Sequence, residues 1–305
     1  MNLLVGATGF VGGHLVEYLF EQGEISKGLF RKGAHLKILD TNGVQGIEGD
    51  VLDHHSLHDG MEGVDTVYNL ASPTPGEDIE FEKANTEGVL NLIEVAKEEK
   101  VKNLIHLSTV DVFGFTNSGR APSEPNPSNP YQKAKAEAER LLLEQSKRSP
   151  SPRIVIIRAA KAVGSRDPSF VTPVLRMAKE GKVTLPDSGV MSFVHPKDVA
   201  QAMLKAATGA APSGTMYTVK SFDATPLALA KELVSATGLP AEVKKQGLFA
   251  GGSLAEYTSK QLRAARVIDA QANWSQLGYA PVFDVKLTSS EVAKWYKKDP
   301  WAIDA

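Results

Sequence analysis

The chain has 305 residues, of which 42% are hydrophobic and 23% charged, a composition that is ordinary for a globular protein. It contains no cysteine, which excludes disulfide bonds, a thiolate zinc site and a cysteine nucleophile. The 34 basic and 36 acidic residues leave a net charge of -2, so neither a nucleic acid nor a membrane surface is expected as a partner. Without a basic leader or an apolar run of about 18 residues, the chain is expected to be cytoplasmic and to lack a transmembrane helix.

Short apolar runs alternate with amphipathic stretches through the first half of the chain. Runs with strand character occupy residues 3–5, 25–31, 44–48, 66–70, 104–109 and 154–157. Helical spacing begins at Phe10, recurs over 89–95, and recurs again from Tyr131 to about Lys147. Regular alternation of this kind predicts an α/β fold with a doubly wound parallel sheet.

Beyond about Gly164 the alternation loosens. Helices are predicted near 170–179, 198–207, 227–236 and 254–265, and strands near Val183 and at 216–219. The segment 116–130 is rich in proline and connects the fifth predicted strand to the helix that begins at Tyr131. Because of this position, we expect the segment to form a wall of the substrate site.

A glycine-rich turn lies between the first predicted strand and the first predicted helix, with the sequence Gly6-Ala7-Thr8-Gly9-Phe10-Val11-Gly12. Glycine permits the tight turn, lets backbone N–H groups approach a pyrophosphate, and allows a helix to pack closely on a strand. The spacing is G-x-x-G-x-x-G rather than the commoner G-x-G-x-x-G, but its position predicts a dinucleotide site at the helix N-terminus. The residues expected to contact the cofactor here are Gly6, Thr8, Gly9, Phe10, Val11 and Gly12.

The end of the second predicted strand bears on which dinucleotide is bound. An acidic residue at this position binds the ribose hydroxyls of NAD, whereas an arginine accommodates the 2′-phosphate of NADP. Here the strand ends in Arg31 and Lys32, and no carboxylate follows until Asp40. The sequence therefore favours NADP(H), while NAD(H) stays open as the alternative.

Several further motifs follow in a characteristic order, namely Gly49-Asp50-Val51-Leu52-Asp53, Asn69-Leu70-Ala71-Ser72, Pro130-Tyr131-Gln132-Lys133-Ala134-Lys135 and residues 192–200. With these motifs the chain resembles an extended short-chain dehydrogenase/reductase of the NAD-dependent epimerase/dehydratase superfamily. Residues 277–296 resemble its dihydroflavonol-reductase and hydroxysteroid-dehydrogenase branch. The resemblance implies a Rossmann fold, cofactor contacts from Asp50, Val51, Leu70, Ala71 and Ser72, and a catalytic group made of Thr109, Tyr131 and Lys135.

Tyr131 and Lys135 lie four residues apart, so a helix places them on one face. A free tyrosine has a pKa of about 10, and a nearby ammonium group favours its ionised form. We therefore expect Lys135 to lower the pKa of Tyr131, which then acts as general base for alcohol oxidation and general acid for carbonyl reduction. By the resemblance, Thr109 holds the substrate oxygen, and both Tyr131 and Lys135 also contact the cofactor.

Other polar residues are candidates for contact with the substrate. Asp111 follows Thr109 closely, and Lys161 and His195 lie in later segments that contribute to the same site. A structural hydrogen bond is an equal alternative for His195. The histidines at 54, 55 and 58 are interpreted as a solvated helix face, and no metal site is expected.

These features lead to a division of the chain and to three functional hypotheses. Residues 1–164, with 192–220 returning to them, are expected to form the NADP(H)-binding Rossmann domain, and 165–305 a smaller, interleaved substrate-binding region. The first hypothesis is an oxidoreductase acting on a small alcohol or carbonyl. The second is a nucleotide-sugar epimerase with a tightly held cofactor, although Arg158-Ala159-Ala160-Lys161 lacks the proline and asparagine usual in such enzymes. The third is a non-catalytic dinucleotide sensor. The resemblance also implies a homodimer that pairs through the helix carrying Tyr131 and the preceding helix, with a monomer as the alternative.

Overall fold

The computed structural model describes residues 1–71, 78–115, 124–245 and 254–303, except for the side chains of 78–81. Its largest layer is a seven-stranded sheet in which every pairing is parallel. Its strands follow the order β10 (Thr215–Val219), β6 (Arg153–Ala159), β5 (Asn103–Thr109), β4 (Thr66–Asn69), β1 (Asn2–Val5), β2 (Ser26–Phe30) and β3 (Gln45–Glu48). The predicted doubly wound parallel sheet is thereby confirmed.

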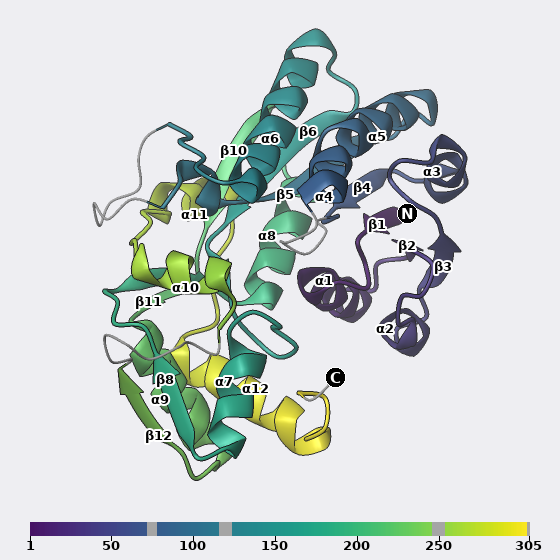
Figure 1. Cartoon of the computed structure of the whole chain (residues 1–305). Coiled ribbons are helices and arrows are strands. Elements are labelled where there is room, and N and C mark those ends of the chain that lie inside the picture. The colour runs from purple at the N-terminus through teal and green to yellow at the C-terminus, as the bar shows by residue number, and fades with distance from the viewer. Residues whose placement is uncertain (72–77, 116–123, 246–253, 304–305) are drawn as a thin grey trace.

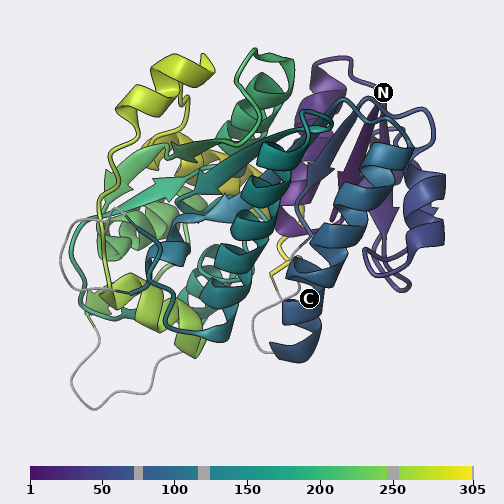
Figure 2. The ribbon, with the colours of Figure 1, turned by 90° about the horizontal axis from the view of Figure 1, so that it is seen from above.

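Helices cover both faces of this sheet, because its central strands carry apolar side chains on both sides. One face is covered by α1 (Phe10–Glu21), α2 (Lys37–Thr41), α8 (Pro196–Thr208) and α11 (Gln271–Leu277). The other face is covered by α3 (His54–Met61), α5 (Glu87–Glu98) and α6 (Pro130–Arg148). Figures 1 and 2 show α1 and α5 on opposite sides of the N-terminal strands.

A smaller unit is built from later segments of the chain. A three-stranded sheet has the order β11 (Phe222–Ala224), β9 (Met191–Val194) and β7 (Lys161–Ala162), and β8 (Lys182–Leu185) pairs with β12 (Glu242–Lys245). The helices of this unit are α7 (Val171–Lys179), α9 (Pro226–Thr237), α10 (Glu256–Arg263) and α12 (Val285–Lys298). Their apolar faces meet in a separate core that includes the fully buried Phe170, Phe193 and Leu233.

The two units are interleaved along the sequence. After β9 has paired within the small sheet, α8 packs on α1 and β10 pairs with β6 in the large sheet. The chain then leaves again for β11 and α9. A division of the molecule at residue 164 stays a prediction.

Some elements differ from expectation. Helix α4 (Asp78–Asn85) was not predicted, because its acidic and apolar residues alternate with a period of two rather than a helical one. Helix α11 was also not predicted. Ser72 and residues 116–123 of the proline-rich segment lie outside the described residues. In the described part of the chain, no helix is long and apolar enough to span a membrane.

Candidate active site

The glycine-rich turn connects β1 to α1 at the point where the strand order of the large sheet reverses. Gly6 has a φ of +86°, and its carbonyl oxygen accepts a hydrogen bond from the N–H of Gly9 at 3.1 Å. A Cβ on Gly12 would lie only 2.0 Å from that same carbonyl oxygen, so helix and turn touch through bare backbone. No side chain caps the N-terminus of α1, which leaves its first N–H groups available to an anion.

A cavity of about 790 Å³ opens at the carboxyl ends of β1 to β4, where ligands of open α/β sheets bind. Nine of the predicted cofactor residues line it, namely Gly6, Thr8, Gly9, Arg31, Lys32, Asp50, Val51, Leu70 and Ala71. Phe10, Val11 and Gly12 form the first turn of α1 beside it. The fold therefore collects residues from four separate strand ends around one cavity that suits an extended ligand.

The charged groups at the β2 and β3 edge of this cavity differ in what they contact. Arg31 and Lys32 follow β2 directly and are exposed to solvent. Asp50 accepts a hydrogen bond from the N–H of Leu52 at 2.9 Å, and Asp53 caps α3. Both of these carboxylates are thus engaged with backbone donors, and they line the cavity together with the two basic residues.

The three predicted catalytic residues come together at the end of β5. Asn129 accepts a hydrogen bond from the N–H of Gln132, and Pro130 occupies the first turn, so α6 begins immediately before Tyr131. Tyr131 forms a side-chain hydrogen bond with Thr109, the last residue of β5. Lys135, one turn along α6, is buried and donates to the carbonyl oxygen of Leu107 at 3.4 Å.

The pKa values of this group depart from expectation. Burial, together with the nearby Asp111 carboxylate, raises the pKa of Tyr131, and its hydrogen bond with Thr109 opposes this only in part. The expected lowering of the Tyr131 pKa is thus not seen, because burial and the Asp111 carboxylate both raise this pKa. Tyr131 accordingly retains its proton at neutral pH, which is the state needed for donation to a carbonyl oxygen.

Burial also lowers the pKa of Lys135, from 10.5 to about 8, although the Glu139 carboxylate partly opposes this shift. The buried ammonium therefore lowers the free energy of unfolding below pH 8. This effect disappears as the pH rises towards 10.5, the ordinary pKa of lysine, which applies in the unfolded chain. We expect Lys135→Met to raise the free energy of unfolding at pH 7 by up to about 3 kcal/mol, and to lose this advantage near pH 10. Urea denaturation at both pH values measures the difference. The exposed Lys133, changed to Met in the same helix, is the control and should show no such pH dependence.

A network of hydrogen bonds around Glu139, one helical turn after Lys135, was not predicted from the sequence. Glu139 is buried one turn further along α6 and accepts a hydrogen bond from Ser108 at 2.6 Å. Its two carboxylate oxygens also accept from Arg158 at 2.9 and 2.7 Å. The helical spacing of Lys135 and Glu139 was the available signal. The network ties α6 to β5 and β6, so it fixes the helix that carries Tyr131 and Lys135.

Asp111 is buried in the short 3₁₀ helix Val110–Phe113 that follows β5. Its carboxylate accepts hydrogen bonds from the Tyr257 hydroxyl at 2.7 Å and from Gln261 at 2.6 Å, both on α10. The Tyr257 ring in turn meets the Tyr131 ring edge-on, with centroids 5.1 Å apart. Tyr257 and Gln261 were missed from the sequence, since 146 and 150 residues separate them from Asp111.

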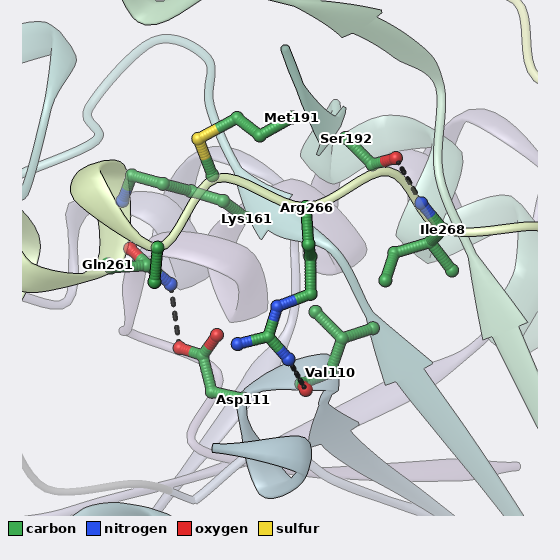
Figure 3. A pocket seen from close by; sticks show the side chains of 9 residues that line it. Val110, Asp111, Lys161, Met191, Ser192, Gln261, Arg266 and Ile268 are labelled. Carbon is green, nitrogen blue, oxygen red and sulfur yellow. Dashed lines mark hydrogen bonds between the residues drawn. The ribbon is translucent and has the colours of Figure 1, made fainter. Parts of the chain in front are cut away.

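Figure 3 shows Asp111 facing a pocket with Lys161 and Arg266 on its other sides. Lys161 is the first residue of β7 and is buried, as is Arg266. The Arg266 guanidinium donates to the carbonyl oxygens of Val110, at 3.1 Å, and Gly114. Two of the three candidate substrate residues, Asp111 and Lys161, are therefore brought together.

His195 is placed differently. Its ring is fully buried, stacks on Phe283 at a centroid distance of 3.6 Å, and accepts a hydrogen bond from the N–H of Lys197 as the cap of α8. Its other ring nitrogen lies 3.5 Å from Glu291. These contacts agree with the alternative that His195 makes a structural hydrogen bond. His195 does not line the pocket at Asp111.

The histidines of α3 are involved in other contacts. His58 pairs with Glu98 and Glu99 at the end of α5, and His54 contacts Asn91 on the same helix. Within the residues that the structure describes, no three His, Asp or Glu side chains are grouped in a way that could hold a metal ion.

Comparison with known proteins places this geometry in context. Residues 2–219 match the model of the NAD dependent epimerase/dehydratase family. The 2-alkyl-3-oxoalkanoate reductase of Shewanella oneidensis is 26% identical, over 93% of this chain and 83% of the relative. The N-acetyl-alpha-D-glucosaminyl-diphospho-ditrans,octacis-undecaprenol 4-epimerase of Escherichia coli O157:H7 is 32% identical, over 61% of this chain and 56% of the relative. Two further curated relatives are matched over 65% and 66% of their own lengths.

A solved structure extends the similarity to the complete fold. The UDP-glucose 4-epimerase of Thermotoga maritima superimposes with a TM-score of 0.81, covering 98% of this chain and 99% of that structure. Its sequence identity is 22%, so this likeness concerns the fold.

Proposed function

Since the chain belongs to the NAD dependent epimerase/dehydratase family, we propose that it is an NADP(H)-dependent oxidoreductase acting on a small alcohol or carbonyl compound. The observation that carries the proposal is the hydrogen-bonded pair of Thr109 and Tyr131, with Lys135 one turn away, at the end of β5. This end of the sheet also holds the cofactor cavity, which is lined by the neighbouring end of β4.

The glycine-rich turn fits a dinucleotide. The backbone approach at Gly12 leaves no room for a side chain, and a Cβ on Gly6 would lie 2.9 Å from the backbone of Leu70. The uncapped N-terminus of α1 offers N–H donors to a pyrophosphate, and Asp50 and Val51 offer contacts to the adenosine part. When bound, the nicotinamide supplies or accepts a hydride.

The protein's own residues then handle the proton and the substrate. Thr109 holds the substrate oxygen beside Tyr131, which donates its proton during reduction and takes it back during oxidation. Lys135 holds the ribose of the cofactor and places a positive charge one helical turn from Tyr131. The raised pKa of Tyr131 favours the protonated form, which can donate a proton to a carbonyl oxygen.

Arg31 and Lys32 support NADP(H) as the cofactor, because a guanidinium and an ammonium bind a phosphate far better than a hydroxyl. We expect the double change Arg31→Ala and Lys32→Ala to raise the KM for NADPH by about 10- to 100-fold, with little effect on the KM for NADH. Steady-state kinetics with both cofactors measure this. Lys37→Ala, an exposed lysine at the start of α2, is the matched control. An equal loss with NADPH and NADH would contradict the assignment.

Reductase and epimerase activities differ in how the cofactor is handled. The oxoalkanoate reductase matches 93% of this chain and supports the first, whereas the epimerase has the higher identity and keeps the second as a candidate. A turnover screen of ketones, aldehydes and nucleotide sugars with NADPH and NADH decides between them. Stoichiometric release of oxidised cofactor supports the reductase, and conversion of a nucleotide sugar with retained cofactor supports the epimerase.

A homodimer and a cytoplasmic location stay predictions. Leu90 supports the dimer, because this apolar side chain is exposed on α5.

A further inference from the structure

The turn that joins β3 to α3 carries two residues that line the proposed cofactor cavity, Asp50 and Val51. The N–H of Asp53 donates to the carbonyl oxygen of Asp50 at 3.0 Å, so residues 50–53 form a β-turn. The N–H of Leu52 donates to the Asp50 carboxylate at 2.9 Å. Both of these bonds are local, because donor and acceptor belong to the turn itself.

A hydrogen bond from α5, the helix beside α3, also reaches this turn (Figure 1). Asn91 donates its side-chain amide N–H to the carbonyl oxygen of Val51 at 3.0 Å. That carbonyl belongs to the same planar peptide as the N–H of Leu52, so the central peptide of the turn is held at both ends. Since types I and II of a β-turn differ in the orientation of this peptide, Asn91 and Asp50 together fix the turn type.

The amide of Asn91 is itself oriented by a neighbour. Its oxygen lies 2.9 Å from Nε2 of His54, the first residue of α3, which donates to it when the ring proton is on that nitrogen. This bond directs the amide nitrogen of Asn91 towards Val51. Gly88, one turn earlier on α5, lies so close that a Cβ on it would be 2.6 Å from the Val51 side chain. Helix α5 therefore meets Val51 at two points.

Two polar groups of the turn are left for a ligand. Among the described residues, neither the N–H of Val51 nor the second carboxylate oxygen of Asp50 has a hydrogen-bond partner. Val51 is only 6% exposed, and an unpaired backbone N–H in a buried residue is costly. A ligand in the cavity that both residues line can satisfy this N–H, provided that the turn keeps its conformation.

We propose that Asn91 is a positioning residue for the dinucleotide, holding the turn 50–53 in the conformation that presents Asp50 and Val51 to the adenosine part. This inference rests on the proposed cofactor site and adds to it a residue that does not line the cavity. His54, interpreted from the sequence as part of a solvated helix face, orients Asn91 in this arrangement. Without the bond from Asn91 the central peptide can rotate, and binding of the cofactor then has to restore its orientation.

The variants Asn91→Asp and Asn91→Leu test the proposal. Aspartate has the shape of asparagine and still accepts from His54, but it has no N–H for the Val51 carbonyl, and leucine removes both bonds without adding charge. We expect the dissociation constants of NADPH and NADH, measured by fluorescence quenching, to rise about 3- to 10-fold in both variants. With a substrate from the turnover screen, the KM for NADPH should rise by the same factor while kcat stays unchanged. The Arg31 and Lys32 variant, in contrast, should affect NADPH alone.

Asn42→Asp is the matched control. Asn42 is also partly buried and donates its amide to a carbonyl oxygen, that of Ile38 at 2.8 Å, but it lies at the end of α2 and does not line the cavity. It should keep the wild-type dissociation constants, and an equal rise in this variant would overturn the positioning role.

The possible failures are distinguishable. Unchanged dissociation constants in both Asn91 variants overturn the inference and leave the proposed cofactor site intact. A rise with aspartate but not with leucine would assign the effect to the added negative charge and also overturn it. If the wild-type protein binds neither NADPH nor NADH, the cofactor site itself is wrong, and the role of Asn91 is refuted with it.

Discussion

Replacing Tyr131 by phenylalanine is expected to lower kcat by about 10²- to 10⁴-fold, the usual contribution of a positioned general acid. The change removes only the hydroxyl that bonds to Thr109 and keeps the ring, which packs against Tyr257. The affinity for NADPH should therefore stay near that of the wild type. Steady-state assays of NADPH oxidation give kcat, and quenching of protein fluorescence by NADPH gives the dissociation constant for this cofactor.

Tyr296→Phe is the matched control, because this partly buried tyrosine lies in the core of the smaller unit, away from the catalytic group. It should retain full activity. If Tyr131→Phe keeps more than a tenth of the wild-type kcat, Tyr131 is not the proton donor. A loss of NADPH affinity that parallels the loss of kcat would instead indicate a damaged cofactor site.

Replacing Gly12 by alanine should have the second large effect, since the added Cβ would lie 2.0 Å from the carbonyl oxygen of Gly6. Backbone cannot move aside as a flexible side chain can, so the glycine-rich turn must deform. We expect the dissociation constant for NADPH to rise by about 100-fold, through the loss of hydrogen bonds to the pyrophosphate. The strain should also lower the free energy of unfolding by about 1–3 kcal/mol.

Gly13→Ala is a close control for this change. It adds the same methyl group one residue later in α1, where the nearest atom is a side-chain carbon of Ile38 at 3.5 Å, an ordinary contact. Alanine also favours helix by about 1 kcal/mol over glycine, so this variant should be as stable as the wild type or more so. Equal effects of the two variants on NADPH binding would show that close approach at Gly12 is unimportant.

Most of the large sheet was predictable because its signals are local. The alternation of apolar runs with helical spacing defined the strands and helices before any contact between them was known. The glycine-rich turn and the Tyr131–Lys135 pair are also local signals. The turn spans residues 6–12, and the pair lies one helical turn apart on α6. Helix α4 was not predicted, because its apolar residues do not recur with the period of a helix.

The environment of the catalytic group was not predictable in the same way. From the sequence, Lys135 was expected to lower the pKa of Tyr131, but burial and the Asp111 carboxylate raise it. How deeply a side chain is buried depends on the segments that cover it. In this case α10 brings Tyr257 against Tyr131 from a distant part of the chain.

The fold class could therefore be predicted from the sequence and is confirmed, because it depends on the local alternation of apolar runs and helical spacing. The dinucleotide site and the proposed catalytic residues are also predictions from spacing within one element or one turn. The surroundings of these residues became visible in the three-dimensional structure. There Asp111 is hydrogen-bonded to Gln261, and Arg266 to Val110, each pair being separated by about half the chain. His195 caps the N-terminus of α8 and does not line the pocket at Asp111. Such contacts depend on how distant elements pack, and no periodic pattern in the sequence records that.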